Sequence, residues 1–300
     1  MTSLKGKTLF ITGASRGIGL AIAVCAAKEG ANVAIAAKTA EPHRHLPGTI
    51  YSAAEEVEAA GGKALPLQVD IRDEAQVEEA VRRTVETFGG LDVCVNNASA
   101  MNQATTLETT MKRFDLVHEV VARGSFMVTK ACLPHLLKAE NPHVLMFCPP
   151  PTFDPRRLSR SLHNAVSKYC ASLYTVGMAE EFREQGVAVN ALRPRTWIGT
   201  SAIKFRRGDA GVAHCRAPEI MGEAACAIFR RPSRECSGQF FIDDEVLYAE
   251  GERDFEKYRI DPTQPLYMSG MSPTDPIPPY VKDLIPAEGV MGRNARDIVV

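Results

Sequence analysis

Three glycines lie close together in the run Thr12-Gly13-Ala14-Ser15-Arg16-Gly17-Ile18-Gly19, between an apolar β-branched stretch and an amphipathic stretch. Glycines at this spacing permit a tight turn and the close approach of a pyrophosphate, whose negative charge is favoured by the free amides and dipole of a following helix. A glycine turn can also simply join a strand to a helix. The strand-turn-helix context favours a dinucleotide site, with Gly13, Ser15, Arg16, Ile18 and Gly19 as cofactor-binding residues.

The end of the second apolar run distinguishes the two nicotinamide cofactors. An acidic residue at this point binds the ribose 2′-hydroxyl of NAD, whereas cations accommodate the 2′-phosphate of NADP. The run ends Ala36-Ala37-Lys38-Thr39, without an acid. Lys38 and Arg16 are expected to clamp a 2′-phosphate, with Ser15 adding a hydroxyl donor, although each cation alone is more often a solvated surface charge. The sequence therefore favours NADP(H) over NAD(H).

Apolar runs that alternate with helical patterns must position these residues. We expect six strands, at Thr8–Ile11, Val33–Ala37, Leu65–Val69, Val93–Val95, Val144–Phe147 and Val187–Leu192. A helix around Glu219–Phe229 and a last strand near Gly238–Ile242 complete the sheet. This alternation is typical of a parallel sheet covered on both faces. The sequence predicts an α/β fold, a single Rossmann-type doubly wound parallel sheet.

The helix after the third strand shows the local pattern most clearly. Asp73 is expected to cap it and Gln76 to complete a capping box, and its apolar stripe comprises Val77, Ala80, Val81 and Val85. Residues 1–250 form the predicted cofactor-binding domain. Beyond Gly251 seven prolines argue against long regular elements, which predicts a tail over residues 251–300, draped over the domain or partly mobile.

Composition excludes several classes of function. The 300 residues carry a formal net charge of -1, so no basic excess exists for nucleic acid, and no apolar run reaches membrane-spanning length. The N-terminus lacks the layout of a signal peptide. Eight spaced cysteines without a CxxC pair indicate neither zinc nor disulfides, and His43-Arg44-His45 has no third metal ligand nearby. We expect no metal, and a cytoplasmic or other reducing soluble compartment.

The sequence resembles the short-chain dehydrogenases/reductases over about residues 5 to 245. Within that family it is most similar to the hydroxysteroid dehydrogenase-like group. The resemblance rests on the glycine turn, Asp70, Asn96-Asn97-Ala98, Lys168 and four longer stretches: Lys38-Thr39-Ala40-Glu41-Pro42-His43, Pro47-Gly48-Thr49-Ile50-Tyr51, Gly177-Met178-Ala179-Glu180-Glu181-Phe182 and Asn190-Ala191-Leu192. It implies that Asp70 hydrogen-bonds near the adenine, that Asn97 lies along the cofactor, and that Ile198 and Thr200 flank the nicotinamide. It also implies a homo-oligomer.

The redox chemistry of that family uses a serine, a Tyr-x-x-x-Lys pair and usually an asparagine in the helix after the fourth strand. Of these positions only Lys168 is kept; Asn164 stands for the tyrosine, Cys148 for the serine and Val121 for the asparagine. An amide does not exchange a proton near neutral pH, so Asn164 cannot be a general acid. Loss of a positioned acid costs on the order of 10²–10⁴ in rate.

Helical geometry argues against the two nearby side chains that could replace the missing general acid. Tyr169 and His163 each lie one residue, hence about 100°, from a useful position. Beside the Lys168 charge, a partly ionised Cys148 would be a nucleophile, although a small buried cysteine is the more common case. Arg156-Arg157 and Arg206-Arg207 border the expected substrate mouth, where they would attract an anionic substrate, although surface charge is the default interpretation. Trp197 is placed to wall the pocket.

Three hypotheses follow. The first is an NADP(H)-dependent oxidoreductase, or a descendant of one, acting on a small carbonyl or alcohol with an altered proton donor. The second is a nucleotide-binding protein without redox turnover, such as a sensor, scaffold or inactive paralogue. The third is a non-redox isomerase, dehydratase or cyclase whose pocket is lined by Asn164, Cys148 and Lys168.

Overall fold

Seven parallel strands form the central sheet, in the order β3-β2-β1-β4-β5-β6-β7. The computed structural model describes residues 3–42, 46–159, 161–270 and 277–285. All strand bounds agree with the predicted runs to within two residues, so the predicted fold is confirmed. The strands are β1 (Thr8–Thr12), β2 (Asn32–Ala37), β3 (Lys63–Gln68), β4 (Val93–Asn96), β5 (His143–Met146), β6 (Ala188–Arg193) and β7 (Phe240–Ile242).

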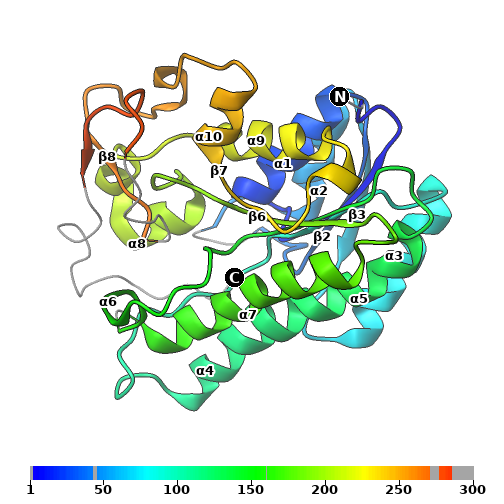
Figure 1. Ribbon diagram of the computed structural model, residues 1–300, viewed down its shortest axis with the longest axis horizontal. Helices are drawn as coiled ribbons and strands as arrows, with labels where there is room; N and C mark the ends of the chain where they lie inside the picture. The colour runs from blue at the N-terminus through cyan, green and yellow to red at the C-terminus, as the bar shows by residue number, and fades with distance from the viewer. Residues whose placement is uncertain (1–2, 43–45, 160, 271–276, 286–300) are drawn as a thin grey trace.

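Helices cover both faces of the sheet, with α1, α2, α9 and α10 on one side and α3, α4, α5 and α7 on the other (Figure 1). Each layer buries its apolar stripe in a separate core, one containing Ile22 and Ile220 and the other Val77 and Val128. The helices are α1 (Gly17–Lys28), α2 (Ile50–Ala59), α3 (Glu74–Phe88), α4 (Met111–His118), α5 (Ser125–Leu136), α6 (Pro155–Leu158), α7 (Leu162–Glu181), α8 (Ser201–Val212), α9 (Glu219–Phe229) and α10 (Asp243–Ala249).

Helix α3 begins as predicted but without the predicted capping box. The Asp73 carboxylate accepts the amide of Gln76 at 3.2 Å. The Gln76 side chain donates to the Asp73 carboxylate and accepts the amide of Asp70, so it does not reach back to the Asp73 amide. A reciprocal box occurs instead at α2, between Thr49 and Ser52, which the sequence pattern did not reveal.

The described part of the tail packs against the segment Arg195–Trp197, which follows β6. It contains a 3₁₀ turn (Glu256–Tyr258) and a two-stranded parallel pair, β8 (Leu266–Tyr267) and β9 (Leu284–Ile285). The amide of Trp197 donates to the Tyr267 carbonyl, and the Ser269 amide donates to the Arg195 carbonyl, both at 2.8 Å. Figure 1 shows α8 and β8 at the same end of the sheet. His43, Arg44, His45, Pro273, Pro276 and Pro286 lie outside the described residues.

Two further features concern membrane-spanning helices and disulfide bonds. Within the ranges given above, no helix is both long enough and apolar enough to cross a membrane. All eight cysteines are free thiols, and all but Cys25 and Cys170 are buried.

Candidate active site

The glycine turn depends on close packing as much as on backbone angles. Gly13 and Gly17 have positive φ values of 66° and 59°, which L side chains rarely adopt. A Cβ on Gly19 would lie 2.6 Å from Asn97 Nδ2 and 2.7 Å from the Gly13 carbonyl oxygen. We call Gly13–Gly19 together with Asn97 the glycine cradle, because only glycine fits at its closest contacts.

Asn97 holds the cradle together from the neighbouring strand. Its side-chain amide donates to the carbonyls of Thr12 and Gly13, at 2.9 and 3.1 Å. Thr12 Oγ1 accepts the amides of Asn97 and Ala98 at 3.0 Å each. The family resemblance implies that Asn97 lies along the cofactor; the structure shows that its side chain also fixes the turn.

The start of α1 is suited to an anion. None of the described side chains caps this helix, and its first turn contains no acidic residue. Its first amides and its dipole are therefore available to a negatively charged group. The residues of the cradle thus fit the pyrophosphate of a dinucleotide.

Arg16 and Lys38, expected to act as one clamp, have different partners in the structure. The Arg16 guanidinium donates to the carbonyls of Pro47 and Gly48, at 3.0 and 2.7 Å. Lys38 Nζ lies 3.2 Å from an Asp70 carboxylate oxygen. Arg16 therefore fastens the loop before α2 onto the turn, and Lys38 is the cation at the end of β2.

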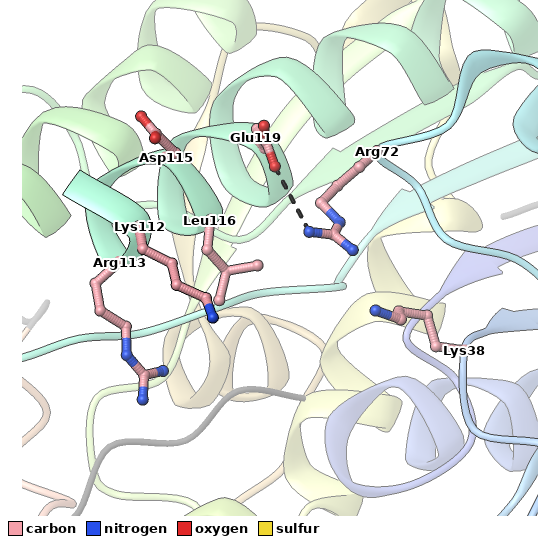
Figure 2. Close-up of a pocket in the computed structure, with 7 residues that line it drawn as sticks. All are labelled: Lys38, Arg72, Lys112, Arg113, Asp115, Leu116 and Glu119. Carbon is pink, nitrogen blue, oxygen red and sulfur yellow. Dashed lines mark ion pairs between the residues drawn. The ribbon is translucent and has the colours of Figure 1, made fainter. Parts of the chain in front are cut away.

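Lys38 opens onto a cavity of about 710 Å³, the cationic cavity, that sequence reasoning missed. Figure 2 shows Lys38 and Arg72 across this space from Lys112 and Arg113, and Arg72 paired with Glu119. The remaining lining residues are Asp115 and Leu116. Since these cations come from the ends of β2 and β3 and from α4, no single stretch of sequence reveals the cluster.

Asp70 is held ionised by two cations that line this cavity, Arg72 and Lys38. Arg72 donates to both of its carboxylate oxygens, and this hydrogen bonding keeps the pKa of Asp70 well below its usual range. Burial acts in the opposite direction and is outweighed. Much of the acceptor capacity that the family resemblance assigns to the adenine is thus engaged by Arg72 and Lys38.

A second cavity, of about 350 Å³, includes Ile18 of the turn in its lining, and we call it the catalytic cavity. It brings together the predicted residues Ile18, Asn164, Lys168, Ile198 and Thr200 with the predicted wall residue Trp197. The other lining residues include hydroxyls, apolar side chains and arginines: Ala100, Met101, Gln103, Pro149, Arg157, Ser161, Ala165, Tyr169, Pro194, Thr196, Ala202, Ile203, Arg206, Arg207, Ser269 and Gly270.

Lys168 and Asn164 reach the catalytic cavity from the same side of α7. Lys168 Nζ donates to the Phe147 carbonyl at 2.9 Å, which anchors the ammonium group at the end of β5. Burial lowers the pKa of Lys168. Asn164 Oδ1 accepts the amide of Asn102 at 3.4 Å, so the side chain at the tyrosine position offers hydrogen bonds and no exchangeable proton.

Cys148 is not among the residues that line the catalytic cavity. Its side chain is fully buried, with Sγ 3.8 Å from Thr175 Oγ1. Burial raises the pKa of the thiol, against the smaller effects of its hydrogen bonds and of the Lys168 charge. Of the two interpretations of Cys148, a nucleophile or a small buried residue, these contacts favour the buried residue, and nothing in them supports cysteine-based non-redox chemistry.

Val121 lies in an irregular helical turn and has an apolar side chain. Residues Glu119–Gly124 form a single π-helical turn between α4 and α5, and Val121 is buried within it. Such turns widen the helix by one residue and occur often at functional sites. The backbone irregularity therefore coincides with the position where the family usually carries asparagine.

Of the two residues considered as replacement acids, only one lines the catalytic cavity. Tyr169 does so, because the cavity wraps around more of α7 than the Asn164–Lys168 face. Burial raises the pKa of its phenol. His163 is buried against Phe114, with ring centres 6.3 Å apart.

The cavity wall is supported from behind by buried ions. Asp244 accepts hydrogen bonds from Arg195 and Arg216 at 2.8 and 2.9 Å, and Asp243 accepts the amide of Arg195 at 2.9 Å. Burial, followed by the charge of Asp244, raises the pKa of Asp243 to about 7. Thr196, Trp197 and Ile198 follow Arg195 directly, so this ion cluster sets the position of the wall.

The known proteins that are similar to this chain in sequence are dehydrogenases and dehydrogenase-like proteins. A family model described as short chain dehydrogenase matches residues 7–207. Hydroxysteroid dehydrogenase-like protein 2 from Danio rerio is 52% identical over 263 residues, which is 88% of this chain and 63% of that protein. The protein of the same name from Homo sapiens is 49% identical over 88% of this chain and 62% of its own length. The chain thus spans less than two thirds of these relatives.

Solved structures agree closely with the described fold. A putative dehydrogenase from Xanthomonas campestris is 54% identical with a TM-score of 0.86, over 89% of this chain and 98% of that one. A short chain dehydrogenase from Mycobacterium thermoresistibile is 44% identical with a TM-score of 0.87, over 93% of this chain and 99% of the other.

Proposed function

The chain belongs to the short chain dehydrogenase family, and on this basis we propose that it is an NADP(H)-dependent oxidoreductase. Its substrate is a small carbonyl compound or alcohol, and its proton donor is a residue other than the family's tyrosine. The observation that carries the proposal is the intact glycine cradle, connected through Ile18 to a cavity into which Lys168 points. NADP(H), when bound, supplies or accepts the hydride at its nicotinamide ring.

The preference for NADP(H) is supported by charge at the end of β2. Residues Ala36-Ala37-Lys38 contain no acid to bind a ribose 2′-hydroxyl. Lys38 shares its cavity with Arg72, Lys112 and Arg113. Asp70 neutralises part of this charge, but the two cations on α4 remain as additional donors for a 2′-phosphate.

We assign the proton donor to Tyr169. It is the phenol that lines the catalytic cavity, whereas the serine and threonine hydroxyls there are too weakly acidic to exchange protons readily. Its raised pKa keeps it protonated at neutral pH, which suits a donor in carbonyl reduction but makes it a slow one. Lys168 orients the cofactor ribose and Asn164 accepts or donates one hydrogen bond at the substrate.

The test is NADPH oxidation by the purified chain over a panel of aldehydes and ketones. Activity above background is expected, and Tyr169→Phe should lower it by about 10²-fold. Tyr51→Phe is the matched control, because Tyr51 is exposed on α2 away from the cavity. If NADPH is not consumed with any substrate, the redox proposal is wrong; if both phenylalanine variants behave alike, only the assignment of Tyr169 is wrong.

A second candidate function is NADP(H) binding without redox turnover. It is favoured by one specific observation: Asn164, Cys148 and Val121 together remove every usual proton-transfer and carbonyl-orienting group, and Cys148 is buried out of reach. It predicts that NADPH fluorescence titrates with the protein while no substrate is reduced. Turnover at an ordinary enzymatic rate would exclude it.

We also propose that the chain forms a homo-oligomer in a reducing compartment. Five apolar side chains on α5 and α7 are more than 40% exposed: Phe126, Leu162, Val166, Leu173 and Val176. We expect these exposed apolar side chains to be covered by a second copy. Light scattering after gel filtration should report an oligomer, and Leu173→Glu with Val176→Glu should shift it toward a monomer; a monomeric wild type would contradict this.

A further inference from the structure

The catalytic cavity is strongly unbalanced in charge. Lys168, Arg157, Arg206 and Arg207 line it, and none of the lining residues in the described part of the chain is an Asp or Glu. The chain as a whole has a formal net charge of -1, so this excess of cations is local. Lys168 belongs to the cofactor side, which leaves three arginines for another ligand.

The arginines converge on the cavity from two separate elements. Arg157 comes from α6, and its side chain is 22% exposed, 4.0 Å from Asp154. Arg206 and Arg207 come from α8; the Arg206 guanidinium donates to Met101 Sδ at 2.8 Å and to Gln103, so it is engaged in shaping the wall. The Arg207 guanidinium lies 5.6 Å from the centre of the Trp197 ring. Arg207 therefore lies beside an aromatic surface, and Arg157 lines the same cavity from α6.

Arg156 shows that this placement is selective. It is the sequence neighbour of Arg157 and also pairs with Asp154, yet its side chain is 88% exposed and does not line the cavity. The sequence alone treated these two residues as equivalent. The structure separates a surface arginine from one that faces the cavity.

We propose that the catalytic cavity selects a carboxylate-bearing substrate with an apolar body, a claim that rests on the proposed function for the reaction itself. Arg157 and Arg207 bind the carboxylate, and Trp197, Ile198 and Ile203 contact the apolar part. A guanidinium matches the geometry of a carboxylate and is less strongly hydrated than an ammonium, which makes arginine effective beside an aromatic wall. The anion also gains from the absence of lining carboxylates in the described residues.

The experiment is isothermal titration calorimetry of the full chain, with and without NADPH, using 4-phenylbutanoate and its uncharged amide. The carboxylate should bind about tenfold more tightly than the amide at low salt, as expected for one net charge-assisted hydrogen-bonded contact. Arg157→Gln and Arg207→Gln should each reduce this preference about fivefold, and together they should abolish it. Arg156→Gln is the matched control and should stay within twofold of wild type.

Melting temperatures of all variants distinguish lost binding from lost folding. Equal affinity for carboxylate and amide, no binding of either, or an equal loss in Arg156→Gln would overturn the proposal. So would clearly tighter binding of 3-phenylpropyl phosphate than of the carboxylate, which would indicate a phosphate site. Carboxylate preference without NADPH oxidation would leave this inference standing and defeat the redox proposal; reduction of neutral carbonyls only would do the reverse.

Discussion

The glycine cradle and the catalytic cavity are neighbours that differ in what holds them. In the cradle, the functional groups are backbone amides, and the side chains serve to let the backbone come close, as at Gly19 and Asn97. In the cavity, the functional groups are side chains: Asn164 lines it at the position of the family's tyrosine, while Val121 and Cys148 are buried and do not line it.

This difference leads us to expect that the two regions tolerate substitution differently. A site made of backbone is lost only when packing is disturbed, which also destabilises the fold. A site made of side chains is lost by single substitutions that the fold tolerates. Binding of the cofactor is thus expected to outlast the chemistry done with it.

The largest effect is expected when the family's usual side chains are introduced at positions 121, 148 and 164. Asn164→Tyr combined with Cys148→Ser and Val121→Asn should raise the rate of NADPH oxidation by about 10²–10⁴-fold, because a positioned general acid returns. NADPH affinity should change little. The measurement is steady-state oxidation beside a fluorescence titration; an unchanged rate in a folded triple variant would mean that the cavity differs in more than these residues.

The cradle should respond to a single methyl group. Gly19→Ala places Cβ within 2.7 Å of the Gly13 carbonyl oxygen. This oxygen belongs to the backbone, so it cannot move away without disturbing the turn. We expect about 1–3 kcal/mol of lost stability, measured by urea unfolding, and at least about tenfold weaker NADPH binding. Gly90→Ala is the control, since nothing lies within 4 Å of the position that its added methyl group would take. Equal effects at both sites would contradict the packing argument.

The buried ions behind the cavity wall make that region sensitive to pH. Because burial raises the pKa of Asp243 to about 7, the folded state holds a proton that the unfolded state releases above pH about 4. The free energy of unfolding should therefore fall as pH rises from about 4 to 7 and then level off.

Asp243→Asn should remove this slope and stabilise the fold by about 1–2 kcal/mol at pH 8.5, since the amide imitates the protonated acid. Urea unfolding at pH 5.5 and 8.5 checks it. A wild-type stability that rises over this interval, with the variant following it, would show that other groups control the response.

The smallest effect is expected at Lys38, whose side chain is 49% exposed. Lys38→Ala should weaken NADPH binding about fivefold and leave NADH binding almost unchanged, because an exposed charge contributes about 1 kcal/mol or less. Titrations with both nucleotides measure the ratio, and Lys63→Ala, an exposed lysine at the start of β3, is the control. An equal loss for NADPH and NADH would remove Lys38 from cofactor selection.

Sequence reasoning performed unevenly across these regions, for physical reasons. Strands and the Asp73 cap follow from local patterns, so they were predicted closely. The cationic cavity was missed because Arg72 and Arg113 are far apart in sequence. The sequence left the choice between a nucleophilic and a buried Cys148 open because burial, which decides the state of a thiol, depends on tertiary packing.

The π-helical turn at Glu119–Gly124 constrains how this site can change further. One substitution is enough to replace a side chain at Val121, but straightening the helix requires a deletion. Straightening the helix without such a deletion would rotate all of α5 by about 100° and turn its buried residues Met127, Val128 and Cys132 away from the core. The irregular turn is therefore fixed by the register of the helix that follows, and point mutations alone can refill the site with a different chemistry.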